Sequence, residues 1–325
     1  MYEKKYDVVA LGELLIDLIE YGKSDRQNPI LEVNAGGAPC NVLAMLNKLG
    51  DKTAFIGKVG NDCFGKQLKN CIIDCGIDAT GLIMDNNAPT TLAIVHTLEG
   101  GEREFSFYRD GGADTKLTKE ELPLDILKNT KIFHFGTLSM TDENIREVTR
   151  LAIDIAKKSG AILSFDPNLR LSLWKSDNLA KEQFLYGLSV CDILKVSDNE
   201  VEWITGTKDI RNGAMYIKQK YPNIKVLLLS MGKEGSKVYY KGYSEEVKAF
   251  VTDKTIETTG AGDTFLGCML HVFCKYGIDN LDYSNFYRWL RFANAGASII
   301  TTRKGALNVM PEKEEIYALS HIDYI

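Results

Sequence analysis

The stretch Glu257-Thr-Thr-Gly-Ala-Gly-Asp-Thr-Phe-Leu-Gly267 decides how the rest of the chain is interpreted. Residues 260–262 have minimal side chains, so their backbone N–H groups can approach an anion closely. From Asp263 to Phe273, apolar residues recur at helical spacing, and Gly277 stands where a helix would end. The stretch therefore predicts a buried helix whose N-terminus binds a phosphate or another anion, because its first amides are unpaired and its dipole is positive there.

Asp263 stands beside this predicted anion position. It could act as a general base that takes a proton from an attacking hydroxyl. A helix N-terminus favours the charged form of a carboxyl, so we expect the pKa of Asp263 to be lowered rather than raised. Phosphoryl transfer tolerates a weak base, because the protein mainly positions groups and neutralises charge. On this stretch alone, a helix-capping aspartate and a tight glycine turn fit the pattern equally well.

Length and composition are those of an ordinary globular protein. The chain has 325 residues, 45% of them hydrophobic and 26% charged, which suits one large α/β domain or two smaller ones. The net charge of −5 gives no general attraction to nucleic acid or to anionic membranes. Seven cysteines without a C-x-x-C pair argue against a disulfide framework or a zinc site. With no signal-peptide pattern and no apolar run of membrane-spanning length, we expect a cytoplasmic protein that binds neither nucleic acid nor membrane.

Two segments near the N-terminus carry candidate ligand-binding residues. Asp17 lies in an apolar segment that follows a predicted strand at 6–12, and a carboxylate in such surroundings needs partners. Substrate hydroxyls could supply them, although a backbone amide or solvent is the simpler explanation on this segment alone. Gly36 and Gly37 precede a predicted helix that contains Asn41. This glycine pair either lets a ligand lie close to the backbone or makes a plain strand-to-helix turn, and both fit equally well.

A predicted β-hairpin interrupts the alternation of strands and helices. Residues 90–98 and 103–109 alternate with period two around a turn at 99–102. We expect this hairpin and the segment 17–33 to form a small sheet that leaves the main body. Arg109 ends the hairpin and could reach a ligand, or it could be a solvated charge on an edge strand.

From about residue 117 the pattern is regular, and it predicts one α/β body without internal repeats or linkers. Ligands bind open α/β sheets at the carboxyl ends of the strands. Asp166 and Arg170 follow one predicted strand there, in a segment that is also ordinary turn chemistry. Asn199 and Glu202 follow the next strand and share one face of a helix. They could hold a metal-bound water near phosphates, or they could be exposed groups of a capped helix.

Together these segments resemble the ribokinase-like, PfkB-type carbohydrate kinase family, from the first predicted strand to nearly the last residue. The N-terminal signature of the family is similar to Gly36-Gly-Ala-Pro-Cys-Asn41 and its continuation through 57–60 and 62–65, and the C-terminal signature is similar to 257–265. The resemblance implies a three-layer αβα fold with a mostly parallel central sheet, in a single domain spanning 1–325. It also implies a β-sheet lid, formed by about 14–34 and 88–113, that often serves in dimerisation, so we expect a homodimer through the lid.

The resemblance implies transfer of the γ-phosphoryl group of ATP to a sugar hydroxyl with Mg²⁺, and it assigns roles to individual residues. Asp263 becomes the base, and the amides of Gly260, Ala261 and Gly262 form the anion hole. The expected substrate contacts are Asp17, Gly36, Gly37, Asn41, Arg109 and Arg170. The expected nucleotide contacts are Lys195, Ser230, Gly232, Gly235 and Asn294, with Asn199 and Glu202 as the magnesium element. Glu257 departs from the Asp of many relatives at a position that helps to bind a monovalent cation in some members, which leaves K⁺ as an optional cofactor.

Within the family, segments 12–17, 106–109, 165–170 and 195–198 are most similar to bacterial fructokinases, so fructose is the expected substrate. Arg109 and Arg170 would equally suit a carboxylate, as in 2-keto-3-deoxygluconate kinases, and that activity is the alternative. A sugar-sensing or scaffolding pseudokinase is the non-enzymatic alternative. It is disfavoured because the base and the anion hole are intact.

Overall fold

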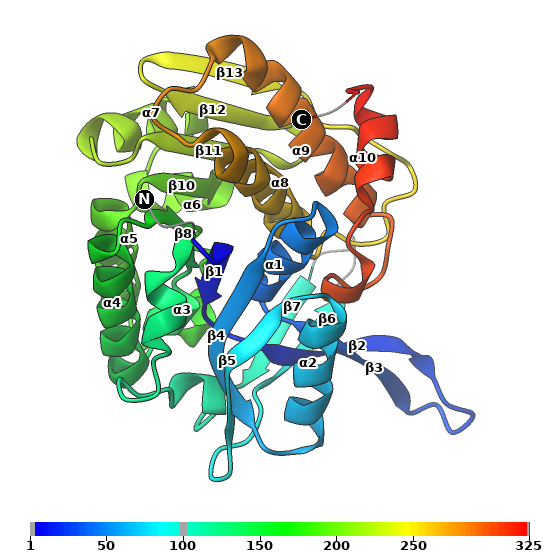
Figure 1. The fold of residues 1–325 in the computed structure, drawn as a ribbon. Helices are drawn as coiled ribbons and strands as arrows, with labels where there is room; N and C mark the ends of the chain where they lie inside the picture. Colours follow the sequence, from blue (N-terminus) through cyan, green and yellow to red (C-terminus); the bar gives the residue numbers. More distant parts are fainter. Residues whose placement is uncertain (1–3, 98–102, 324) are drawn as a thin grey trace.

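The computed structural model describes residues 4–97, 103–323 and 325, with the backbone alone for 96, 97 and 103–105. These residues form a nine-stranded sheet and a separate four-stranded sheet (Figure 1). The predicted fold class, an αβα body with a mostly parallel sheet and a small second sheet, is confirmed. None of the described helices has the length and apolar character that a membrane span requires.

The central sheet has the strand order β13-β12-β11-β10-β9-β8-β1-β4-β5. Neighbours from β11 to β5 pair in parallel, whereas β12 and β13 are antiparallel additions at one edge. The strands are β1 (Tyr6–Leu11), β4 (Thr53–Gly60), β5 (Asp78–Asp85), β8 (Thr130–Phe135), β9 (Ile162–Phe165), β10 (Ile193–Ser197), β11 (Val226–Ser230), β12 (Ser236–Tyr240) and β13 (Tyr243–Val247).

Helices cover both faces of this sheet, and β1 shows why both faces are buried. Val8 and Ala10 point into one hydrophobic cluster, and Val9 and Leu11 point into another, as the alternation of side chains along a strand requires. The first cluster includes side chains of α1 (Ala38–Lys48), α2 (Cys63–Asp74), α8 (Ala261–Tyr276), α9 (Phe286–Ile300) and α10 (Lys313–Ser320). The second includes those of α3 (Leu124–Lys128), α4 (Glu143–Lys158), α5 (Asp177–Val190), α6 (Asp198–Thr205) and α7 (Ile210–Lys220).

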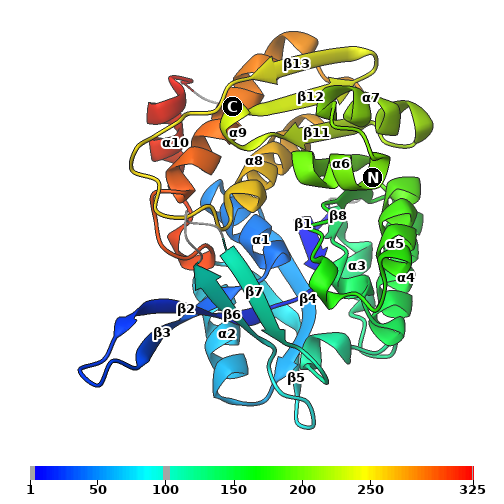
Figure 2. The ribbon, with the colours of Figure 1, turned by 180° about the vertical axis from the view of Figure 1, so that it is seen from behind.

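The small sheet has the order β3-β2-β6-β7, with β2 and β6 parallel and the outer pairs antiparallel. Its strands are β2 (Leu15–Lys23), β3 (Pro29–Gly36), β6 (Leu92–Thr97) and β7 (Arg103–Tyr108). The predicted hairpin of β6 and β7 is therefore confirmed, while its predicted turn at 99–102 lies outside the described residues. Both views show the β2–β3 hairpin extending away from the body (Figures 1 and 2). The predicted lid segments contain these strands, and their action as a lid stays a prediction.

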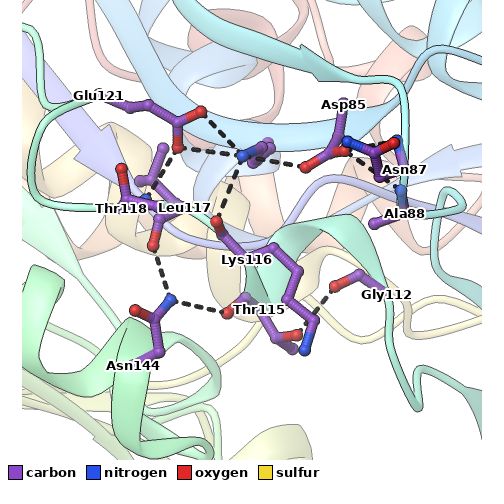
Figure 3. Close-up of polar contacts among 11 residues, drawn as sticks. Asp85, Asn87, Ala88, Gly112, Thr115, Lys116, Leu117, Thr118, Glu121 and Asn144 are labelled. Atoms are coloured by element: carbon purple, nitrogen blue, oxygen red, sulfur yellow. Dashed lines mark hydrogen bonds and ion pairs between the residues drawn. The ribbon is translucent and has the colours of Figure 1, made fainter.

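A buried lysine of the central sheet binds the chain segment that follows the small sheet. The amine of Lys58, in β4, lies 2.9 Å from the carboxylate of Asp85 and 2.8 Å from that of Glu121. It also donates to the carbonyl of Lys116 at 3.2 Å. Figure 3 shows these groups approaching one amine from several sides. Because a buried charge needs such partners, this network fixes the segment against β4 and β5.

Candidate active site

A cavity of about 590 Å³ opens beside the carboxyl ends of the central strands. Its wall combines segments that follow β1, β8 and β9, side chains of β2, β7 and β10, and the N-termini of α1 and α8. This is the edge at which an open α/β sheet binds its ligands. The lining residues are Glu13, Leu15, Asp17, Gly37, Ala38, Asn41, Phe107, Leu138, Asn168, Arg170, Lys195, Thr258, Thr259, Gly260, Gly262 and Asp263.

Asp263 lies in the first turn of α8 and faces this cavity. The amide Nδ2 of Asn41 donates to its Oδ2 at 2.8 Å. Burial, and then the charge of Asp166, raise the pKa of Asp263 to about 6, against the opposing effects of Asn41, Lys195 and Arg170. The expectation of a lowered pKa was therefore wrong. The loss of solvent at this helix N-terminus outweighs the groups that favour the carboxylate.

The anion site predicted at the start of α8 also faces the cavity. Gly260 caps the helix in the left-handed conformation, with φ of 76°, which a glycine adopts without strain. Gly260 and Gly262 line the cavity, whereas Ala261 does not, and its N–H donates to the carbonyl of Thr258 at 3.2 Å. The first N–H groups of a helix have no intrahelical acceptors, so those of Gly260 and Gly262 are the better placed for an anion. Their role in an anion hole stays a prediction.

Lys195 brings a positive charge to the same place. Its amine lies 2.8 Å from the carboxylate of Asp166, and both side chains are buried. Burial lowers the pKa of Lys195, but the charges of Asp166 and Glu200 more than offset this and raise it to about 12. A Cβ atom on Gly262 would lie 2.9 Å from the lysine nitrogen, so the amine packs closely against this glycine. Lys195 thus stays cationic beside the start of α8.

Four of the six predicted substrate residues line the cavity: Asp17, Gly37, Asn41 and Arg170. Gly36 supports one of them, because a Cβ atom there would lie 2.1 Å from Oδ2 of Asp17.

Arg109 lies behind the cavity wall. Its Nε donates to Asp114 at 2.7 Å, and its two terminal nitrogens donate to Thr141 and to the carbonyl of Leu138, each at 2.8 Å. Leu138 lines the cavity, whereas Arg109 does not. The structure thus uses this buried guanidinium to fix the wall, and its direct contact with a substrate stays a prediction.

The predicted nucleotide residues beyond Lys195 lie outside the cavity lining. Ser230 ends β11, and Gly232 and Gly235 flank the turn that follows, with φ of 52° and 110°. Asn294, in α9, accepts from Ser236 at 2.8 Å and donates to the carbonyl of Val247 at 3.0 Å. Its amide therefore links α9 to β12 and β13. Nucleotide contacts by these four residues stay predictions.

The predicted magnesium pair does not face the cavity. Asn199 and Glu202 are exposed on α6, and neither lines the cavity. Ser197 and Glu200 have the same spacing, and Glu200 is buried: its carboxylate accepts from the N–H groups of Ser197 at 2.8 Å and Leu169 at 2.9 Å. The position of Asn199 and Glu202 does not fit a metal held at the cavity, and we assign no step to them.

Glu257 is buried and connects two turns near the site. Its Oε1 accepts from the N–H of Gly305 at 2.9 Å. A Cβ atom on Gly260 would lie 2.8 Å from that of Ala306, so the turn containing both Gly305 and Ala306 packs directly on the start of α8. Glu257 therefore holds this turn in place, and a monovalent cation beside it stays a prediction.

Sequence reasoning missed several lining residues. Glu13 was the one with a usable signal, because it directly follows the glycine that ends a predicted strand. Ala38, Asn168, Thr258 and Thr259 lie inside segments that were predicted to bind a ligand, although none of the four was singled out. Leu15, Phe107 and Leu138 depend on how distant segments meet, which the sequence pattern does not specify.

Comparisons with known proteins identify the family of the chain. The model of the pfkB family of carbohydrate kinases matches residues 5–313, and the chain belongs to that family. The predicted family and kinase class are thereby confirmed. The chain is 38% identical over 314 residues to fructokinase-1 of Zea mays, covering 96% of this chain and 97% of that one. It is 40% identical over 314 residues to fructokinase-2 of Solanum lycopersicum, with 96% and 95% covered.

Solved structures show the same similarity. A fructokinase from Xylella fastidiosa with bound ATP superposes with a TM-score of 0.87 at 31% identity, covering 97% of this chain and 98% of that one. A double-mutant fructokinase from Vibrio cholerae O395, in a form with fructose, ADP and potassium ion, superposes with a TM-score of 0.85 at 26% identity, with 98% and 99% covered.

Proposed function

We propose that this protein is a fructokinase, which transfers the γ-phosphoryl group of ATP to a hydroxyl of fructose. The observation that carries the proposal is the position of Asp263: a carboxylate with a raised pKa faces a cavity at the N-terminus of α8, where an anion is favoured. Relatives named as fructokinases match nearly the whole chain, and a solved one binds fructose and ADP.

In the proposed reaction, Asp263 accepts the proton of the attacking hydroxyl. Its pKa of about 6 leaves it ionised at neutral pH and makes it a better base than an ordinary aspartate. The bond from Asn41 to Oδ2 holds the carboxylate in place for this step. The amides at Gly260 and Gly262, with the amine of Lys195, neutralise the charge on the transferred phosphoryl group.

The carboxyl groups around the cavity suit the hydroxyls of a neutral sugar. Asp17 and Asp263 bring carboxyl groups to its lining, and carboxylates accept hydrogen bonds from sugar hydroxyls. Arg170 is the one arginine among the lining residues of the described chain. Arg109 lies behind the cavity wall and pairs with Asp114. The two-arginine argument for 2-keto-3-deoxygluconate is therefore weakened.

ADP release measured over a panel of acceptors tests the proposal. The panel contains fructose, 2-keto-3-deoxygluconate, ribose, tagatose phosphate and a nucleoside, and kcat/KM for fructose is expected to be the highest. A higher value for 2-keto-3-deoxygluconate would replace fructose with that acid. Sugar binding without turnover of any acceptor would support the non-enzymatic alternative instead.

ATP is proposed to bind with Mg²⁺, which supplies positive charge to the phosphates and typically keeps several of its waters. The solved fructokinase with potassium motivates a test for a monovalent cation. Initial rates in K⁺, Na⁺ and Tris buffers at equal ionic strength would show activation by K⁺ if the Glu257 region binds that ion. Equal rates in the three buffers would remove K⁺ from the proposal.

We also propose a homodimer through the small sheet, in the cytoplasm. The β2–β3 hairpin exposes Tyr21, Ile30, Leu31 and Val33, with exposed fractions between 38% and 64%. Exposed apolar side chains gathered on one hairpin are typical of a protein interface. The seven cysteines are free thiols, which supports a reducing compartment.

A further inference from the structure

Glu13 supplies a cap to the helix that carries Asn41. Glu13 is buried directly after β1, and its Oε1 accepts from the N–H of Ala38 at 3.0 Å. Ala38 is the first residue of α1, and the preceding Gly37 has no side chain that could cap the helix. A carboxylate at a helix N-terminus binds an otherwise unpaired donor and interacts favourably with the dipole. Glu13 therefore fixes the start of α1 from a distant position in the sequence.

The backbone reinforces this contact. Gly37 has φ of 130°, and a Cβ atom there would lie 2.5 Å from the carbonyl oxygen of Glu13. A side chain at this position would collide with the backbone of the preceding strand segment. Both the side chain and the main chain of Glu13 thus define where α1 begins.

The position of Asn41 depends on where α1 begins. Its N–H donates to the carbonyl of Gly37 at 3.0 Å, which makes it part of the first turn of α1. Its Nδ2 donates to Asp263, while its Oδ1 is buried without a hydrogen-bond partner among the described residues. The bond to Asp263 is thus the single hydrogen bond of the Asn41 side chain among the described residues. The position of α1 therefore determines where that bond can form.

We propose that Glu13 is a positioning residue that holds the start of α1 and, through Asn41, the carboxylate of Asp263 in the geometry that proton transfer requires. The role of Glu13 in proton transfer rests on the proposed function. The charges that act on Glu13 are those of Arg109 and Asp114, which are paired with each other. Burial raises the pKa of Glu13 to about 7, so this carboxyl is costly to keep ionised here. Such a cost is typical of a group retained for function rather than for stability.

Kinetics of matched variants test the proposal. Glu13→Ala is expected to lower kcat by about 10- to 100-fold with little change in the KM for sugar, because a misplaced base slows the chemical step. Glu13→Gln is expected to recover most of this loss, since an amide oxygen also accepts from Ala38. In a double-mutant cycle, Glu13→Ala should cost less than about threefold once Asn41→Ala is present. Ser176→Ala is the control, because it removes the cap of α5, a helix that contributes no residue to the cavity lining.

An NMR titration of the Asp263 carboxyl carbon, without sugar or ATP, gives a readout that does not depend on turnover. The Asn41 bond lowers the pKa of Asp263, so Glu13→Ala and Asn41→Ala should both raise it, whereas Ser176→Ala should not. If Glu13→Ala does not fold, Glu13→Asp, which shortens the side chain by one methylene, replaces it. A wild type without kinase activity would refute the proposed function but leave this titration valid. Three results would overturn the proposal. They are losses of kcat for Glu13→Ala and Asn41→Ala that multiply in the double variant, an Asp263 titration that Glu13→Ala leaves unchanged, and a raised KM for sugar at constant kcat.

Discussion

At the scale of single residues, the raised pKa of Asp263 predicts the pH dependence of the reaction. The free enzyme is active when this base is ionised, so kcat/KM for the sugar should fall below about pH 6 as one proton binds. An ordinary aspartate would lose its charge near 3.8. Initial rates between pH 4.5 and 9 check this. A plateau that continued to pH 4.5 would contradict the assignment, and Asp263→Asn should be nearly inactive at every pH.

The same pKa predicts an effect on stability. Between pH 4 and 6 the folded protein holds a proton on Asp263 that the unfolded chain has lost, so the contribution of this residue to wild-type stability falls as the pH rises through this range. Asp263→Asn removes this dependence. The variant should match the wild type near pH 4 and exceed its free energy of unfolding by about 1–3 kcal/mol at pH 7. Urea denaturation of both proteins at the two pH values measures the difference, and an equal or less stable variant at pH 7 would refute the explanation.

At the scale of elements, Arg109 anchors the end of β7 to the segment after β8. Arg109→Ala leaves the buried carboxylate of Asp114 without its partner, so the free energy of unfolding should fall by about 3–5 kcal/mol. Arg211→Ala is the matched control: this arginine pairs with Glu234 and Glu246 on the surface and should cost about 0–1 kcal/mol. Chemical denaturation measures both. Unchanged stability with a large increase in the KM for sugar would instead identify Arg109 as a substrate contact.

The elements also show what could be predicted from the sequence. The strand predicted at 6–12 and the helix predicted from Asp263 to a stop at Gly277 match β1 and α8 closely, because an apolar pattern that extends over a whole element reflects its burial directly. The inward face of α6 could not be predicted in this way. Ser197 with Glu200 and Asn199 with Glu202 have the same spacing, and only the angle at which α6 leaves β10 decides which pair turns inward.

The prediction of a lowered pKa for Asp263 was wrong for a related reason. The sequence shows the helix N-terminus that favours a charge, but it does not show the depth of the cavity that removes water from that charge. Lining residues such as Phe107 and Leu138 were missed because their positions depend on how the two sheets meet.

At the scale of the whole molecule, the exposed apolar face of the small sheet predicts self-association. Leu31 and Val33 lie on one face of β3, and placing charges there with Leu31→Glu and Val33→Glu together should convert a dimer to a monomer, because two buried charges would repel across the interface. Analytical ultracentrifugation measures the mass. Met215→Glu on α7 is the control for adding a charge at an exposed apolar residue elsewhere. A wild type that sediments as a monomer at micromolar concentration would remove the dimer from the proposal.

The place of β1 between β4 and β8 has a consequence for the nascent chain on the ribosome. β4 follows β1 soon in synthesis, but Phe135, the β8 partner of Leu11, is made about 120 residues after it. At elongation rates of about 5–20 residues per second, one edge of β1 waits about 6–25 s for its neighbour. An apolar strand with an unpaired edge is prone to aggregate during that interval. Translation intermediates that end before residue 130 are therefore expected to be the species most dependent on chaperones.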